Sequence, residues 1–258
     1  MATKYQDVNI LEYAGNVPEK DYSERDEVEF LNYAYKHLRE FEGEIPHLYL
    51  DPNGYVTIGI GHLIISAHES TSLPFIYKVI PDPPHEVPPE EKEEAWQKVK
   101  DLMPTILKDF LNKMKKFPSA NNAIFKDATN LKLDENAIRK IFDDDLAIRL
   151  REIRNIFKRY DKYPDPAKLG IIDLYYNVRN FSQFVVFKKC VLKEDWHCAG
   201  VESNRKGPNK ERLDKARNLF DEAGEIKRKY DRDNYRLAPD NQKSILAAEK
   251  SYDDVWQS

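Results

Sequence analysis

Residues 41–62 read FEGEIPHLYLDPNGYVTIGIGH and join two carboxylates to a short β-pattern that a turn interrupts. Asp51 follows Glu42 by nine residues, and Thr57 follows Asp51 by six. The stretch ends on two glycines, spaced two residues apart, and a histidine. It therefore places side chains that can donate or accept protons beside backbone that has no side chains to cover it.

A helix is expected before this stretch, beginning near Ser23 or Asp26, either of which can cap it. Spacings of three and four residues predict one helix face that carries Val28, Leu31, Tyr35, Leu38 and Glu42. Gly43 is expected to end the helix. Glu42 then lies in the last turn and faces the core, where burial and the helix dipole both disfavour its ionised form. Such a carboxyl suits a general acid, although a structural glutamate paired with a buried arginine fits the same pattern.

The remainder of the stretch predicts a β-hairpin. Its second strand points Val56, Ile58 and Ile60 toward the core, because they alternate with polar or small residues. Residues 52–54, Pro-Asn-Gly, suit a three-residue loop in which the glycine takes the left-handed conformation. This register pairs Tyr49 with Thr57.

The same register sets Asp51 opposite Tyr55, so Asp51 and Thr57 lie diagonally on one face of the hairpin. Gly59 and Gly61 continue that face and leave room for a bulky ligand against the backbone. The alternative is an ordinary hairpin whose Asp51 only starts the turn.

Hydrolysis of a glycosidic bond needs one carboxylic acid to protonate the leaving oxygen and one carboxylate to activate or position water. The stretch resembles the phage-type lysozymes, glycoside hydrolase family 24, whose pattern is Glu-Gly, an Asp nine residues after the Glu, and G-x-x-T-I-G-x-G-H. Here these positions are Glu42-Gly43, Asp51 and GYVTIGIGH at 54–62. The resemblance continues in blocks over residues 27–222, through DLYYNVRNF with Asn177 and the closing segment with Arg205 and Arg212.

The resemblance implies a lysozyme-like α+β fold, in which a small β-hairpin lobe and a larger helical lobe surround a cleft. It implies hydrolysis of the β-1,4 bond between N-acetylmuramic acid and N-acetylglucosamine in peptidoglycan, without a cofactor. Glu42 would be the general acid, Asp51 would hold and polarise the attacking water, and Thr57 would orient that water, so that the anomeric centre inverts. The expected substrate-binding residues are Leu63, Tyr176, Tyr49, Gly59 and Gly61.

Two departures from the family pattern affect the biological role. Residues 65–128 are longer and richer in proline than in compact phage enzymes, and the net charge of −4 differs from that of many wall-lytic enzymes. The closing S-N-R-K-G run resembles lysozyme-fold bacteriocins such as pesticin, and secreted antibacterial effectors. This resemblance implies a toxin whose partners are peptidoglycan strands and either an immunity or inhibitor protein or a delivery machinery.

Other sequence features narrow the chemistry. His62 is expected to form a structural pair with Asp145, although a catalytic role for His62 fits as well. The histidines show no metal-ligand spacing, which predicts no metal site. Cys190 and Cys198 form no metal or redox motif, and are either two buried thiols or a disulfide. The GIGHLI run lacks the third glycine of a dinucleotide-binding loop.

Composition and the distribution of charged and apolar residues set the expected organisation of the chain. The chain has 258 residues, 33% of them charged, and its acidic balance gives no long-range attraction to nucleic acid. The N-terminus has no basic region followed by an apolar one, and no apolar run is long enough for membrane insertion. We therefore expect synthesis in the cytoplasm and delivery to the cell wall or periplasm by another system. The expected segments are a lead-in at 1–22, a catalytic domain at 23–230 with an insertion at about 65–128, and a polar tail at 231–258.

Two functions of other classes fit the same sequence. A lysozyme-fold module could bind wall glycan without cutting it, or the chain could be a structural part of a phage or secretion particle. The intact set of Glu42, Asp51 and Thr57 favours the enzyme, because a pure binding protein gains nothing from a buried acid.

Overall fold

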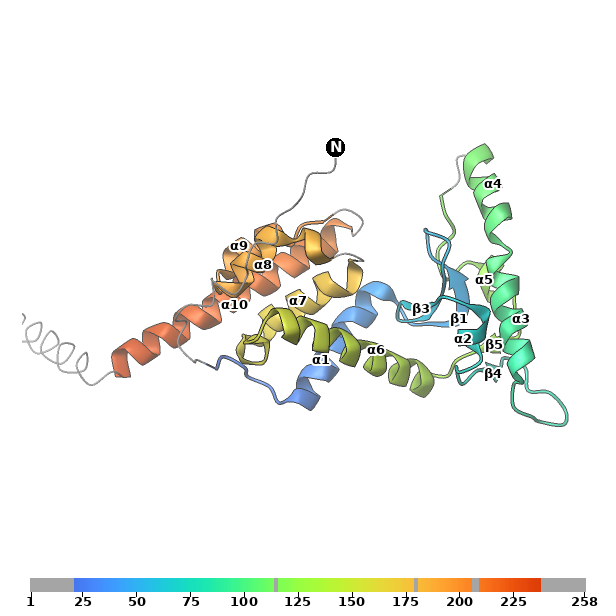
Figure 1. The fold of residues 1–258 in the computed structure, drawn as a ribbon, viewed down its shortest axis with the longest axis horizontal. Helices are drawn as coiled ribbons and strands as arrows, with labels where there is room; N and C mark the ends of the chain where they lie inside the picture. The colour runs from blue at the N-terminus through green and yellow to red at the C-terminus, as the bar shows by residue number, and fades with distance from the viewer. Residues whose placement is uncertain (1–20, 114–115, 179–180, 206–208, 238–258) are drawn as a thin grey trace, which may run out of the picture. The chain divides into compact units, whose positions relative to one another are not determined.

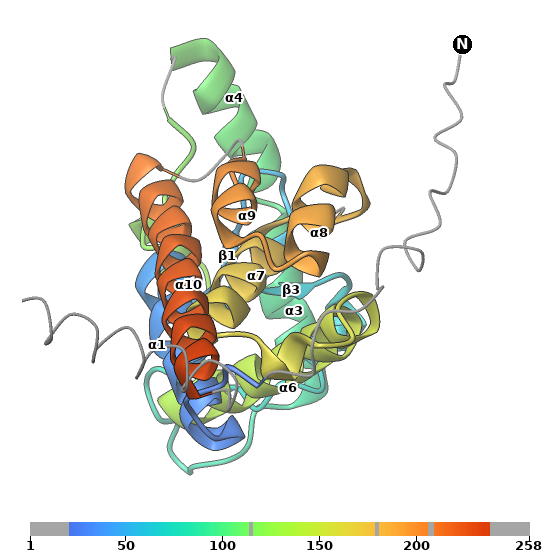
Figure 2. The same cartoon turned by 90° about the vertical axis from the view of Figure 1, so that its left-hand side faces the viewer.

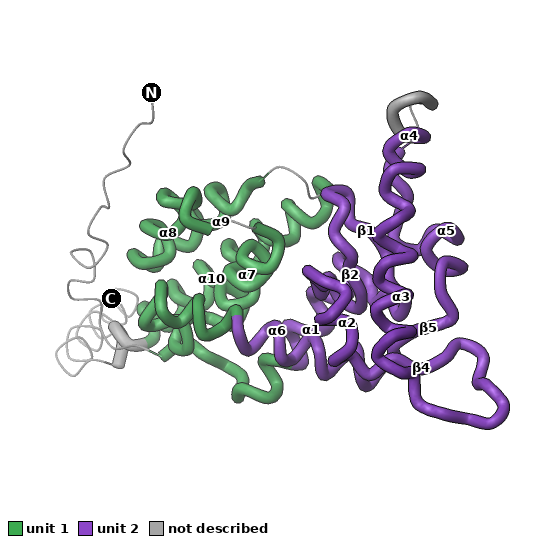
Figure 3. Tube along the Cα trace, turned by 45° about the vertical axis from the view of Figure 1, so that its right-hand side comes forward, with its two compact units in different colours: residues 1–31, 149–258 green, residues 32–148 purple. Residues whose placement is uncertain are grey.

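The computed structural model describes residues 21–113, 116–178, 181–205 and 209–237 (Figure 1). These residues form helices and two small antiparallel sheets, so the predicted α+β class is confirmed. The chain divides into two compact units (Figure 3): residues 32–148, and residues up to 31 together with those from 149 onward. The helices α1 (Glu27–Glu42) and α6 (Glu135–Ile156) each contribute residues to both units. The catalytic domain expected over 23–230 includes residues of both units.

The hairpin lies in the unit of residues 32–148, as part of a three-stranded sheet. The strands β1 (Ile45–Leu50), β2 (Val56–Gly59) and β3 (His62–Ile64) pair in the order β1-β2-β3. Tyr49 pairs with Thr57, which confirms the predicted register. The backbone N–H of Asp51 donates to the carbonyl of Tyr55 at 2.9 Å and extends this register into the loop. Gly54 has a φ of 80°, as the three-residue loop requires.

Helices from the proline-rich part of the chain lie in the same unit as this sheet. They are α2 (Ala67–Ser70), α3 (Pro89–Lys100), α4 (Met103–Lys113) and α5 (Ala123–Lys126), and a second sheet pairs β4 (Ile76–Tyr77) with β5 (Leu131–Lys132). Since α3 packs against β1 and β2, the segment expected as an insertion at about 65–128 contributes to the core of this unit. The buried residues at this contact include Leu48, Leu50, Val56, Ile58, Ala95 and Val99.

The helices α3 and α4 are separate, because a turn at Asp101 and Leu102 lies between them. Pro104 is the second residue of α4. Its ring excludes the carbonyl of the residue four positions earlier from a helical bond, so a helix begins more easily at this position than it continues through it.

The other unit is helical over its described residues. It contains α7 (Asp165–Asn177), α8 (Val185–Leu192), α9 (Trp196–Glu202) and α10 (Lys210–Leu237), with short 3₁₀ turns at Tyr160–Lys162 and Phe181–Gln183. Figure 2 shows α10 beside α7 and α9, against which it packs. A Cβ at Gly170 of α7 would lie 2.7 Å from the Phe220 ring of α10. Glycine therefore permits the close approach of these two helices.

Three observations set the boundaries in this unit. The segment 184–203 contains two helices, since Glu194 adopts a φ of 53° between α8 and α9. Tyr22 is buried, so the lead-in ends before it. The α10 helix continues through 231–237, where a polar tail was expected. The predictions for residues 1–20 and 238–258 concern positions outside the described residues.

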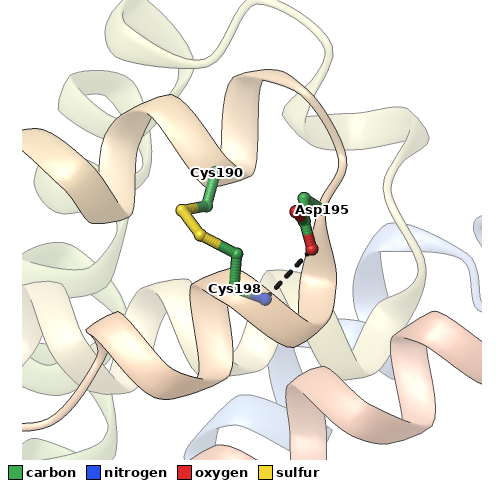
Figure 4. Close-up of a disulfide and its surroundings, with 3 residues drawn as sticks. All are labelled: Cys190, Asp195 and Cys198. Carbon is green, nitrogen blue, oxygen red and sulfur yellow. Dashed lines mark hydrogen bonds between the residues drawn. A yellow bond between two sulfur atoms is a disulfide. The ribbon is translucent and has the colours of Figure 1, made fainter.

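The two cysteines are joined by a disulfide between α8 and α9 (Figure 4). Asp195 begins α9 and accepts a hydrogen bond of 3.0 Å from the backbone N–H of Cys198. The cap therefore fixes the first turn of α9 at the position where Cys198 faces Cys190. Of the two alternatives from the sequence, the structure adopts the disulfide.

Candidate active site

Glu42 is the last residue of α1, as predicted. Gly43 follows with a φ of 75°, and its backbone N–H donates to the carbonyl of Arg39 at 3.0 Å. The glycine takes the left-handed conformation that ends many helices. Glu42 therefore projects from the terminal turn, beside the start of β1.

The predicted core face of α1 is wrong at its beginning, because Val28 is 68% exposed. The buried row is Phe30, Ala34 and Leu38, at spacings of four. Glu42 continues this row by one further turn, but it is partly exposed and not buried. The carboxyl therefore lies at the margin of a buried row, where solvent or a substrate reaches it.

Asp51 follows β1 and organises the hairpin loop. Its Oδ1 accepts hydrogen bonds from the backbone N–H groups of Asn53 at 2.9 Å and Tyr55 at 2.8 Å. Its Oδ2 accepts from the Asn53 side-chain amide at 3.1 Å. This is the Asx-turn role of an aspartate. The three donors fix the orientation of a carboxylate that remains partly exposed.

Tyr49 relates the two carboxylates to each other. Its side chain is 9% exposed, and burial is the largest cause that raises the pKa of its hydroxyl. The negative charges of Glu42 and then Asp51 raise that pKa further. Both carboxylates therefore lie within electrostatic reach of the same phenol, although they come from different elements. With so little exposed surface, Tyr49 offers a sugar only a small contact area.

Thr57 lies opposite Tyr49 on β2, and it is 5% exposed. Its hydroxyl donates to the backbone carbonyl of Tyr55 at 3.2 Å. The hydroxyl proton therefore points toward the Tyr55 carbonyl, and the lone pairs of the hydroxyl oxygen can accept a hydrogen bond from water.

Backbone conformation accounts for the presence of glycine at two positions after Thr57. Gly59 and Gly61 have φ values of 65° and 75°. A Cβ at Gly59 would lie 3.5 Å from Ile138 Cγ2 of α6, which is ordinary packing distance. At Gly59 the space beside the backbone is therefore bounded by α6. The role of both glycines in ligand binding stays a prediction.

The predicted pairing of His62 with Asp145 is confirmed. His62 Nδ1 lies 2.8 Å from Asp145 Oδ2, and the side chains are 26% and 25% exposed. The bond ties β3 to α6. Leu63, next to His62, is 41% exposed and is accessible to a ligand.

The last expected substrate contact, Tyr176, belongs to the other unit. The guanidinium of Arg149 lies 4.9 Å from the centroid of its ring, a cation–π contact. The structure therefore brings Glu42, Asp51, Thr57, Tyr49 and the glycines into one unit without testing the role of Tyr176.

A buried ion cluster in the unit of Tyr176 was only partly anticipated. Arg205 Nη2 lies 2.6 Å from Asp173 Oδ2, and Arg212 Nη2 lies 2.8 Å from Asp173 Oδ1. All three side chains are almost fully buried. Asn177 donates to the carbonyl of Asp173 at 2.8 Å. The two arginines are thus structural partners of Asp173, whose position on an apolar helix was the only signal in the sequence.

Pockets, metals and membrane spans add nothing to the site itself. Two pockets of the described residues are lined by other side chains than Glu42, Asp51 and Thr57. Within the described ranges no group of three or more His, Cys, Asp or Glu could hold a metal ion. No helix among those ranges is long and apolar enough to cross a membrane.

Comparison with known protein families and with curated proteins gives no match for the chain. The site therefore rests on its own residues and geometry.

Proposed function

We propose that the protein is a peptidoglycan hydrolase, a muramidase with a lysozyme-like fold that cleaves the β-1,4 bond between N-acetylmuramic acid and N-acetylglucosamine. The observation that carries the proposal is the position of Tyr49. Its hydroxyl is within electrostatic reach of both Glu42 and Asp51, and its backbone pairs with Thr57. Two carboxylates and a hydroxyl are thereby gathered in one unit.

Each group has a chemical role that its environment supports. Glu42, at the exposed end of a buried row, donates a proton to the leaving oxygen. Asp51, oriented by three N–H donors, accepts a hydrogen bond from the attacking water and polarises it. Thr57, whose proton is directed to the Tyr55 carbonyl, accepts from the same water. A water held between the sugar and Asp51 leads to inversion of the anomeric centre.

The test is digestion of purified peptidoglycan, followed by mass spectrometry and NMR of the first products. We expect new reducing ends on N-acetylmuramic acid, which appear first as the α-anomer. A reducing N-acetylglucosamine or a 1,6-anhydro product would contradict hydrolysis of this bond. A first-formed β-anomer would contradict inversion and make Asp51 a nucleophile.

A glycan-binding module is the second candidate, because one observation favours it. The bonds that Asp51 accepts from Asn53 and Tyr55 are those of an ordinary turn. A binding module would sediment with insoluble peptidoglycan and release no soluble fragments. The biological role that we propose, a bacteriolytic enzyme or antibacterial toxin delivered to the wall, requires the release of fragments.

A further inference from the structure

The proline-rich segment encloses a pocket that the proposed reaction does not use. The pocket measures about 880 Å³ and is formed entirely by residues 74–134 of the hairpin-containing unit. Its volume lies within the range of ligand-binding sites, about 300–1,000 Å³. It is bounded by β4, β5 and the loop that leads to α3.

Three lysines line the pocket, and two of them are held in place. Lys92 Nζ donates to the backbone carbonyls of Thr71 at 3.0 Å and Leu73 at 2.8 Å. Lys78 Nζ likewise donates to the carbonyls of Lys126 and Thr129. An ammonium has three N–H donors, so each of these lysines retains one beyond its two carbonyls. Both charges are therefore oriented before any ligand arrives.

The third lysine, Lys132, carries its charge next to Lys78. Lys132 belongs to β5 and pairs with Ile76 of β4. Burial lowers the pKa of Lys78, and the charge of Lys132 lowers it further, while Asp127 opposes the shift. Among the described residues no side-chain hydrogen bond or ion pair holds the Lys132 ammonium. Two like charges in the lining of one pocket favour the binding of an anion there, because the anion relieves their mutual repulsion.

The pocket lining also contains two carboxylates, Asp134 and Glu86. Asp134 Oδ1 accepts a hydrogen bond of 2.7 Å from the backbone N–H of Ala137, because Asp134 caps α6. Glu86 is exposed on the opposite loop. The lining thus carries three ammoniums against two carboxylates, in a chain whose net charge is −4.

The rest of the wall is mostly apolar, and two of its rings contact each other. The Tyr77 and His85 rings contact each other edge to face at 5.3 Å, and the Tyr77 hydroxyl donates to Glu91 at 3.0 Å. Ile76 and Ile80 are exposed at 41% and 75%. The other apolar lining residues are Pro74, Phe75, Pro81, Pro84 and Val87. A wall of this kind binds a ligand that has its own apolar surface, which a bare phosphate chain lacks.

We propose that this pocket binds a short peptide that carries carboxylates, with Lys132, Lys78 and Lys92 on its anionic groups and the proline-rich wall on its side chains. Under the proposed function, which this step requires only for the source of the ligand, the peptide is the acidic stem peptide of peptidoglycan. The pocket would then hold a glycan strand by its peptide while another part of the unit acts on the sugar.

The experiment is isothermal titration of the full chain with a synthetic, sugar-free stem tetrapeptide that contains D-glutamate and meso-diaminopimelate. Its carboxamide form and inorganic phosphate serve as comparison ligands. The protein variants are Lys132→Gln and, as a matched control, Lys36→Gln, which removes the same charge from an exposed position of α1 in the same unit. Lys132 is chosen because no described hydrogen bond of the fold depends on its ammonium.

We expect the peptide to bind, and Lys132→Gln to weaken binding about tenfold or more, as expected for the loss of a charge-assisted contact. Amidation should weaken binding similarly, and Lys36→Gln should leave it unchanged. Absence of peptide binding, equal binding by Lys132→Gln, or phosphate binding stronger than peptide binding would each overturn the proposal. Digestion of purified peptidoglycan by the same preparation is measured in parallel: peptide binding without release of fragments would reject the proposed function and leave this proposal standing, whereas release of fragments without peptide binding would do the reverse.

Discussion

His62 and Asp145 are joined by a hydrogen bond of 2.8 Å between Nδ1 and Oδ2, which connects the last strand of the hairpin sheet to α6. The contact gives His62 a structural role that a motif alone cannot distinguish from a catalytic one. We expect His62→Leu to lower the free energy of unfolding by about 1–2 kcal/mol, because leucine cannot donate a hydrogen bond to the Asp145 carboxylate. Peptidoglycan hydrolysis should stay within a few-fold of wild type. A loss of 100-fold in rate with an unchanged melting temperature would instead assign His62 to catalysis.

Glu42→Gln should lower the rate of wall clearing by at least about 100-fold, because it removes the general acid. Turbidity of a wall suspension measures the rate, and circular dichroism shows that the fold is retained. Glu44→Gln is the matched control two residues away. Glu44 lies beside Arg39 and accepts from the Tyr35 hydroxyl, which assigns it to the structure of this turn. Near wild-type clearing by Glu42→Gln would reject the proposed acid.

Thr57→Val tests the water-orienting hydroxyl with little change in shape. We expect hydrolysis to fall roughly tenfold or more, since the barrier rises when the water is no longer held. The unfolding free energy should fall by about 1 kcal/mol, the contribution of the bond to Tyr55. Thr57→Ser retains the hydroxyl and should recover most of the rate. Equal rates for the valine and serine variants would remove Thr57 from the mechanism.

His47 predicts a dependence of stability on pH. Its Nε2 lies 2.9 Å from the carbonyl oxygen of Ala120, and burial is the main cause that lowers the pKa of the imidazole, with Lys78 and Lys126 adding to it. The unfolded chain has a His pKa of about 6.5 and therefore binds a proton in a range where the folded chain does not. Stability is fully present above this value and is lost as pH falls from about 6.5 toward the lowered pKa.

The measurement for His47 is the melting temperature between pH 8 and pH 5, for wild type and His47→Gln. Glutamine can still donate to the Ala120 carbonyl but does not titrate. We expect the decrease toward acid pH to be smaller in the variant. Parallel pH curves for the two proteins would show that another group causes the decrease.

The disulfide between Cys190 and Cys198 predicts sensitivity to reduction. The cysteines are 8 residues apart in sequence, and closure of so short a loop in the unfolded chain accounts for about 2–3 kcal/mol. A reducing agent should therefore lower the melting temperature of wild type. It should have no effect on a Cys190→Ala, Cys198→Ala double variant, and equal responses of the two proteins would contradict the stabilising role.

The hairpin was predictable from the sequence because its causes are local. Alternation with period two sets which residues face the core, and the Pro-Asn-Gly loop sets the register that pairs Tyr49 with Thr57. Gly43 ends α1 for an equally local reason, since only glycine adopts its left-handed conformation at no cost. The hairpin and the end of α1 together set the backbone positions from which the side chains of Glu42 and Asp51 extend.

The buried face of α1 could not be decided in this way. Rows that begin at Val28 and at Phe30 both have helical spacing, and both contain Leu38 and Glu42. Which row is covered depends on where other elements of the chain pack, and that information is not periodic in the sequence. The structure leaves Val28 exposed and buries Phe30. Glu42 therefore continues the row that begins at Phe30, but it is only partly buried.

The sequence by itself determined the hairpin, its register and the end of α1, because neighbouring residues fix backbone dihedrals and strand pairing over a few positions. Tertiary structure alone decided that Asp173 holds two arginines, and that Lys78, Lys92 and Lys132 line one pocket. These groups are separated by tens of residues, and only packing of the folded chain brings them together. Electrostatic contacts at such separations depend on distance in space, which no local pattern encodes.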